Sequence, residues 1–216
     1  ENDVKAFDEK IIPDLIQENK LVSEYDAVLG SAQIEFRGGT YNLSQLGKFL
    51  QDADRETRKE AAIAMDAWMG EHEEVLGGIY DKLVHLRDGI AKKLGYKRFT
   101  ELGYLRLGRT DYDPEMVKCY REQIQRDVVP VCQKLYKVQM KGLGIKDPRY
   151  YDYNLFFKSG NPKPAGDEKY LVNEAHKMYS SLGEESKEFF EFMMNNELMD
   201  LDARKGKAPG GYCTYF

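Results

Sequence analysis

The feature that most constrains the fold is a helical pattern of apolar residues that runs from Asp54 to Leu94 almost without a break. Apolar residues recur every three or four positions, which is typical of a helix with one buried face. At about 1.5 Å per residue, such a helix spans about 60 Å. It cannot bury its own apolar stripe, so we expect other helices to flank it and predict a mainly α fold.

Shorter patterns fill the rest of the chain, which we interpret as a single unit over residues 1–216. Alternating apolar and polar residues around Gly38-Gly39 predict a β-hairpin near residues 33–43. Ser44 is a candidate cap for a short helix after it. Four further stretches have helical spacing: 6–29, 114–142 with a kink at Pro130, 170–182 and 189–198. Residues 211–216 read as a terminal β-strand.

Composition excludes several classes of protein. The chain is 42% hydrophobic and 32% charged, as folded proteins are, and its formal net charge of −5 argues against nucleic acid as a partner. No run approaches the roughly 18 apolar residues of a membrane span. Three widely spaced cysteines fit no metal or redox motif, so we expect free thiols and a cytoplasmic location.

The sequence contains one partial motif of catalytic chemistry. A zinc-binding His-Glu-x-x-His helix places two histidines on one face, but His72-Glu73-Glu74-Val75-Leu76 has leucine in the second position. The plainer interpretation is a histidine packed on its own helix. The other conspicuous feature is an aromatic cluster at residues 150–157, which either lines a peptide groove or packs beneath a long loop. Packing is the favoured interpretation.

The C-terminal residues have the pattern of a β-strand without a partner strand. Residues 204–211 form a basic, glycine-rich loop, and an apolar strand pattern follows it up to Phe216. A strand needs a partner for its backbone groups, so we expect the rest of its sheet to lie in further sequence. The first residues, Glu1-Asn-Asp-Val, lack a methionine and read as a cut end.

Three motifs, in this order, carry a family resemblance: Ile34-Glu-Phe-Arg-Gly-Gly-Thr-Tyr-Asn-Leu43, Asp54-Arg-Glu-Thr-Arg-Lys-Glu-Ala61 and Arg204-x-Gly206-Lys207-x-x-Gly210-Gly211-Tyr212. They resemble the oligoendopeptidase F family of zinc metallopeptidases, relatives of thimet oligopeptidase. The resemblance implies the helical part of a zincin-type oligopeptidase that ends before its His-Glu-x-x-His helix. It implies a full-length enzyme with zinc that hydrolyses internal bonds of short peptides.

By the same resemblance, this chain supplies channel wall and scaffold, binds no metal and is inactive alone. None of its residues is expected to be catalytic. Gly210, Gly211 and Tyr212 are the candidate site residues, as support for the strand that borders the cleft. The remainder of the polypeptide is the expected partner. The alternative is a non-catalytic helical interaction module, which should not end on an unpaired apolar strand.

Overall fold

A computed structural model describes residues 2–213 and confirms a mainly α fold with a two-stranded antiparallel hairpin. The hairpin strands are β1 (Ile34–Phe36) and β2 (Gly39–Tyr41). Short 3₁₀ helices are η1 (Glu9–Ile11), η2 (Gly47–Gln51) and η4 (Tyr150–Asp152), and η3 (Ile124–Val128) is a π-helical turn. The α-helices are α1 (Asn2–Lys5), α2 (Ile12–Gly30), α3 (Leu43–Leu46), α4 (Arg55–Glu71), α5 (Glu73–Lys93), α6 (Phe99–Arg106), α7 (Pro114–Gln123), α8 (Val129–Leu143), α9 (Glu168–Leu182) and α10 (Glu184–Asn195).

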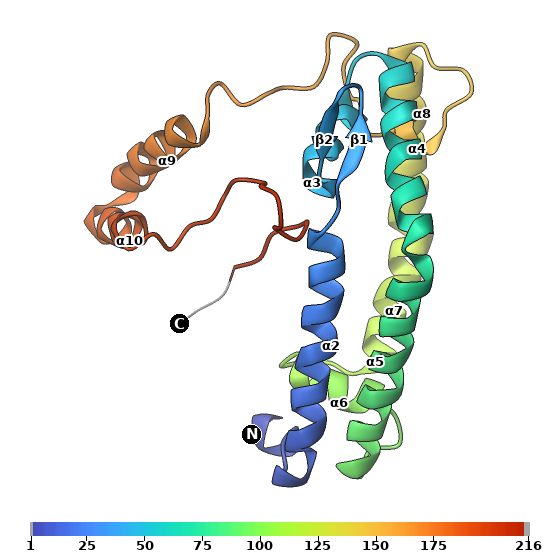
Figure 1. The fold of residues 1–216 in the computed structure, drawn as a ribbon, viewed down its shortest axis with the longest axis vertical. Helices are drawn as coiled ribbons and strands as arrows, with labels where there is room; N and C mark the ends of the chain where they lie inside the picture. The colour runs from blue at the N-terminus through green and yellow to red at the C-terminus, as the bar shows by residue number, and fades with distance from the viewer. Residues whose placement is uncertain (1, 214–216) are drawn as a thin grey trace.

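The long helix predicted near residues 55–94 is divided at His72 into α4 and α5, which continue in nearly the same direction (Figure 1). The His72 ring stacks on Trp68 with centroids 4.0 Å apart, and its Nδ1 lies 2.8 Å from the Trp68 carbonyl oxygen. That carbonyl also accepts the His72 backbone N–H at 3.2 Å. A side chain that competes for a backbone carbonyl loosens the helix locally, which explains the break.

The β-hairpin turns through two residues with positive φ, Arg37 (46°) and Gly38 (81°). Two-residue hairpin loops favour this geometry because it matches the twist of the strands. The guanidinium of Arg37 is held by Glu60 of α4, with Nη2–Oε2 at 2.8 Å. The pairing register joins Ile34 to Tyr41 and places Ile34 and Phe36 on the buried face.

The cap of the short helix α3 is Asn42 rather than Ser44. The Asn42 Oδ1 atom accepts the Gln45 N–H at 2.8 Å, and the Gln45 side chain accepts the Asn42 N–H at 3.1 Å. This reciprocal capping box satisfies two backbone donors at once, which a cap at Ser44 would not do.

The kink predicted at Pro130 takes the form of a π-helical turn just before it. Residues Ile124–Val128 (η3) lie between α7 and α8. The proline ring has no N–H and clashes with the carbonyl four residues earlier, at Arg126, so the backbone widens there.

No helix within residues 2–213 is long and apolar enough to cross a membrane.

Three apolar clusters hold together a body made of η1, α2, the β-hairpin and α3 to α6. The β-hairpin, α3 and α4 enclose the first around Leu46 and Trp68, whereas α2 and α5 enclose the second around Ile79. The third joins η1, α5 and α6 through Ile11 and Ile90, both 0% exposed. An ion triad around the buried Glu18 of α2 adds to this packing, because its carboxylate meets the half-buried Arg87 of α5 at 2.7 Å. The same carboxylate meets Arg106 of α6 at 3.0 Å.

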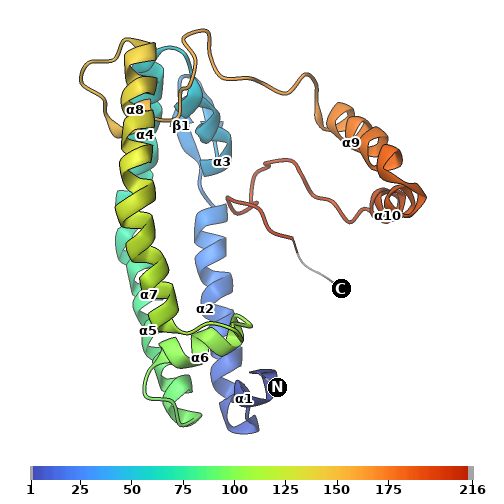
Figure 2. The ribbon, with the colours of Figure 1, turned by 180° about the vertical axis from the view of Figure 1, so that it is seen from behind.

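Two parts lie outside this body. Helices α7 and α8 form a second rod, which overlaps α4 and α5 in both views, and the helix pair α9–α10 lies apart at the end of a long connection (Figures 1 and 2). Among the residues described for α9 and α10, only Phe190 is buried. Its ring stacks on Tyr179 with centroids 4.7 Å apart, beside a hydrogen bond of 2.9 Å between His176 Nε2 and Glu191 Oε1. Both parts expose many large apolar side chains.

Candidate functional site

The chain returns from α10 to the body through a loop closed by Lys207. Its Nζ donates to the carbonyl oxygens of Asp200 at 2.7 Å and Asp202 at 2.8 Å. The Asp200 carboxylate forms ion pairs with Arg204 and with Lys207, and hydrogen bonds from Arg204 and Lys207 lower the pKa of Asp200. Lys207 therefore stabilises the conformation of this loop, because its ammonium group hydrogen-bonds two backbone carbonyls of the loop.

The loop is attached to the β-hairpin end of the body. Asn42 Nδ2 donates to the Arg204 carbonyl at 3.0 Å, and Gln45 Nε2 donates to the Ala203 carbonyl at 3.0 Å. At Gly30, an added Cβ would stand only 3.1 Å from the Gly206 oxygen. Glycine at position 30 thus permits a close approach of the two backbones.

The sequence-predicted site residues lie just beyond this attachment. Gly210 has φ +100°, which explains glycine there, but no described atom lies within 4 Å of a Cβ built on Gly210 or Gly211. The side chain of Tyr212 is 93% exposed. Residues 211–213 adopt no strand and have no ladder partner within the described range, whereas residues 214–216 of the predicted strand fall outside it.

The aromatic segment after α8 is anchored by a buried carboxylate, Asp152, which is 0% exposed. Arg55 and Arg58 of α4 each approach it to 2.8 Å, and the Arg149 N–H donates to it at 2.9 Å. Burial alone would raise the pKa of Asp152, but hydrogen bonds from Arg55, the Arg149 N–H and Arg58 outweigh it and lower the pKa to about 2. The carboxylate fixes the segment against α4.

Anchoring does not bury the aromatic rings. Tyr150 is 60% exposed, Phe156 60% and Phe157 55%. The Tyr150 hydroxyl donates to Asp66 Oδ2 at 2.6 Å, an interaction that raises the pKa of Tyr150. Tyr151 and Tyr153 are half-buried. The favoured interpretation of packing therefore fits these two rings, and the other three face outward.

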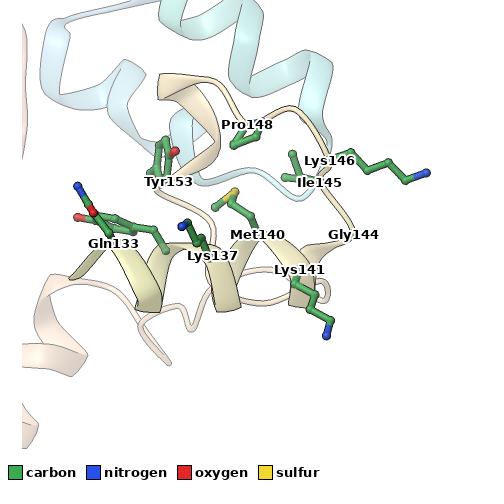
Figure 3. Close-up of a pocket in the computed structure, with 10 residues that line it drawn as sticks. Gln133, Lys137, Met140, Lys141, Gly144, Ile145, Lys146, Pro148 and Tyr153 are labelled. Carbon is green, nitrogen blue, oxygen red and sulfur yellow. The ribbon is translucent and has the colours of Figure 1, made fainter. Parts of the chain in front are cut away.

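A pocket of about 660 Å³ opens between α8 and the loop that follows it (Figure 3). The loop is held to the helix because Gln139 Nε2 donates to the carbonyl oxygens of Tyr153 at 3.0 Å and Leu155 at 2.7 Å. Met140 stands at the centre of the pocket, facing Pro148, with Ile145 at one side. The remaining lining residues are Gln133, Tyr136, Lys137, Lys141, Gly144, Lys146 and Tyr153.

The part of the chain that the structure describes offers no metal centre. No group of three His, Cys, Asp or Glu side chains in residues 2–213 is placed to hold a metal ion. His72, from the partial zinc motif, stacks on Trp68 of its own helix. His85 contacts Asp81 on α5, and His176 contacts Glu191 on α10. The described residues do not fit a zinc site, and no catalytic step is assigned to them.

Among known proteins, the chain matches three solved structures of peptidases. An oligoendopeptidase F from Bacillus anthracis str. Ames is 48% identical with a TM-score of 0.93. PZ peptidase A, solved with an inhibitor, is 47% identical with a TM-score of 0.94, and a further oligoendopeptidase F is 44% identical with a TM-score of 0.94. No family model and no curated protein matches the chain.

Each match covers 99% of this chain and 38–39% of the solved chain, so this sequence spans about two fifths of their length. The fold and the neighbours define a part of a peptidase. More narrowly, the chain belongs to the oligoendopeptidase F family. The match over nearly every residue means that the outlying helices are arranged around the body as in the solved relatives.

Proposed function

We propose that this chain is a segment of a zinc metallo-oligoendopeptidase that hydrolyses internal bonds of short peptides. The observation that carries the proposal is identity of 44–48% over 99% of the chain to peptidases more than twice its length. About three fifths of those chains have no counterpart in this sequence. The catalytic residues and the zinc ligands belong to that remainder of the polypeptide.

Its role in the enzyme is to form wall and scaffold around the space where peptides bind. Support comes from the two outlying parts, whose apolar side chains face outward while their arrangement matches that of the solved relatives. Such faces fit contact with the remainder of the polypeptide, because large exposed apolar patches mark interaction surfaces. A formal net charge of −5 favours peptides over nucleic acid as ligands, and three free cysteines favour a cytoplasmic location.

Gly210, Gly211 and Tyr212 are proposed to support the edge of the cleft. They follow directly on the loop that Asn42 and Gln45 attach to the body, so their backbone leaves a fixed point. The open surroundings of both glycines and the exposure of Tyr212 leave room for a strand of the remaining polypeptide.

The experiment joins this chain to the complementary part of the Bacillus anthracis relative. The chimaera should contain one zinc ion per molecule by elemental analysis and should cleave an internally quenched peptide. The 216-residue chain alone should do neither. Stoichiometric zinc in the isolated chain, or a folded, zinc-loaded chimaera without peptidase activity, would overturn the proposal, and the second result would favour a non-catalytic interaction module.

A second variant tests the tail. Gly211→Val in the chimaera should lower peptide cleavage more than it lowers zinc content, because valine adds bulk where a second backbone is expected to approach. The matched control is Gly77→Val on the exposed face of α5 in the body, where an added Cβ also meets nothing within 4 Å. Equal activity of the two variants would contradict the proposed role of Gly210, Gly211 and Tyr212 at the edge of the cleft.

A further inference from the structure

The charge of the chain is distributed unevenly. Residues 129–164, which contain α8 and the following loop, hold seven basic and two acidic side chains, a net charge of +5, in a chain whose net charge is −5. One of the two acidic residues, Asp152, is already paired with Arg55 and Arg58. The segment around the α8 pocket is therefore a positive region on an acidic protein, and such a region attracts anions.

Three lysines of the pocket lining have no internal partner. Lys137, Lys141 and Lys146 form no ion pair or hydrogen bond with any residue in the described range, and each is exposed. Figure 3 shows Lys141 and Lys146 extending outward from the rim. Lys158 adds a fourth amino group, 3.9 Å from a Cβ built on Gly144. Long lysine side chains reach an anion at the rim while the interior stays apolar.

The interior of the pocket suits an aromatic or aliphatic side chain. Met140, Ile145 and Pro148 supply an apolar surface, and the rings of Tyr136 and Tyr153 meet edge to face with centroids 5.1 Å apart. The volume of about 660 Å³ lies within the range of about 300–1,000 Å³ for small-molecule sites. Methionine is adaptable and tyrosine amphipathic, so the wall can accept different apolar groups.

The pocket is also preformed. Helix α8 ends at Leu143 and is capped by Gly144, with φ +78°, and the Ile145 N–H donates to the Met140 carbonyl at 2.9 Å. Gln139 holds the far side of the loop through the Tyr153 and Leu155 carbonyls. A fixed backbone on both sides reduces the entropy lost when a ligand binds.

We propose that the pocket between α8 and the 144–153 loop binds short anionic peptides, with an apolar side chain inserted between Met140 and Tyr153 and carboxylates facing Lys137, Lys141 and Lys146. The choice of a peptide rests on the proposed function, whereas the charge and shape are properties of this chain. The site would favour acidic peptides among those that reach the enzyme, separately from any residue that hydrolyses them.

Direct binding to the 216-residue chain tests the proposal. The probe is the tetrapeptide Asp-Glu-Glu-Phe, titrated by calorimetry at low salt and mapped by ¹⁵N chemical-shift changes. Expected are saturable binding, shifts centred on residues 133–153, and affinity that falls as salt rises. Lys-Lys-Lys-Phe should bind at least about tenfold more weakly, because like charges repel. Shifts centred elsewhere, or equal affinity for both peptides, would overturn the assignment.

Variants separate charge from packing. The triple change Lys137→Gln, Lys141→Gln and Lys146→Gln should weaken binding about tenfold, because each exposed charge pair contributes about 0.2–1 kcal/mol. The matched control changes three exposed lysines on other helices, Lys20, Lys82 and Lys169, to Gln and should leave affinity unchanged. Equal losses in both triples would show attraction by net charge alone and would overturn the site. Circular dichroism checks that each variant is folded.

The chimaera distinguishes this proposal from the proposed function. If the chain and the chimaera both bind the acidic peptide but the chimaera cleaves nothing, the pocket stands and the peptidase proposal fails. If the chimaera cleaves peptides and binds Asp-Glu-Glu-Phe no better than Lys-Lys-Lys-Phe, the pocket is overturned alone. Binding to the isolated chain that disappears in the chimaera would show that the remaining polypeptide fills the pocket, which also overturns it.

Discussion

The body and the helix pair α9–α10 are built from similar amphipathic helices, yet they place their apolar side chains differently. In the body, side chains such as Leu46, Ile79 and Ile90 are at most 1% exposed. In α9–α10, exposed residues outnumber the single buried Phe190, and each of the following is at least 40% exposed: Tyr170, Leu171, Met178, Tyr179, Leu182, Phe189 and Phe192.

The difference shows that one chain can contain a part that is stabilised from within and a part whose stability depends on an additional surface. Amphipathic helices form when their apolar faces are covered, because isolated helices of this length are marginal in water. Body helices cover one another, whereas α9 and α10 cover only one strip of each other. The sharpest measurements therefore compare the two parts under the same conditions.

The largest expected effect is in amide hydrogen exchange. Amides in the middle of α5 should exchange only through global unfolding, which costs about 5–15 kcal/mol in ordinary domains. Amides of α9 and α10 should exchange through local opening that costs about 1–2 kcal/mol, because one buried side chain secures them. Mass spectrometry of exchange resolves both regions in one sample. Equal protection of α5 and α9 would contradict the comparison.

Among the substitutions, removal of the buried Asp152 carboxylate should lower the free energy of unfolding the most. Asp152→Ala removes the carboxylate that pairs with Arg58, and Arg58, which is 1% exposed, stays behind as a buried charge. Breaking a buried ion pair on one side costs about 3–5 kcal/mol. Urea unfolding measures the loss. Asp147→Ala, whose ion pair with Arg149 is at the surface, serves as control and should cost less than about 1 kcal/mol. Similar losses would show that Asp152 is not the anchor.

Truncating apolar side chains compares the two parts directly. Ile79→Ala in the α2–α5 cluster should cost about 2–5 kcal/mol, because it leaves a cavity at a site that is 1% exposed. Phe189→Ala on α10, a site that is 61% exposed, should change the unfolding free energy of the isolated chain by less than about 0.5 kcal/mol. A large effect at Phe189 would mean that α10 is covered in solution.

Acid should weaken the body by a smaller amount, because a protonated Asp152 keeps its position. The pKa of Asp152 in the folded chain is about 2, below the ordinary value of 3.8. Its contribution is therefore complete above about pH 4 and is lost as the pH falls towards 2. Urea midpoints measured across this window should fall more steeply for the unaltered chain than for Asp152→Asn. Parallel pH profiles would rule out this contribution.

The smallest effect is expected at the start of α9. The Asp167 Oδ1 atom accepts the Tyr170 N–H at 3.0 Å, and loss of an N-cap costs about 1 kcal/mol. Asp167→Ala should therefore increase exchange in α9 several-fold and leave α5 unchanged. Faster exchange in α5 as well would show that the two parts unfold together.

Much of the fold could be predicted because the helices and the hairpin depend on residues that are close together in the sequence. The period of three to four residues marks the helices, and Gly38-Gly39 between alternating residues marks the hairpin. The break at His72 was missed because it depends on one ring finding the Trp68 carbonyl. Asn42 and Ser44 are both good caps by residue type, and only the reciprocal bond with Gln45 decides between them.

The candidate sites were harder to predict because they depend on residues far apart in the chain. The pairing of Asp152 with Arg58 spans 94 positions, and no local period indicates it. Arg55 and Arg58, three residues apart on one helix face, were the available signal. The α8 pocket could have been suggested by the excess of lysine between residues 129 and 164, whereas the walls that shape it require the folded loop.

The bond between Asn42 and the Arg204 carbonyl also sets an order of events during synthesis. It joins positions 162 residues apart, so it forms only after almost all of this sequence has left the ribosome. The β-hairpin and α4 emerge first and can fold as a unit, since chains fold from the N-terminus during translation. The side-chain amides of Asn42 and Gln45 therefore remain open to solvent until the returning loop arrives, so this attachment forms after the β-hairpin and α4 have emerged.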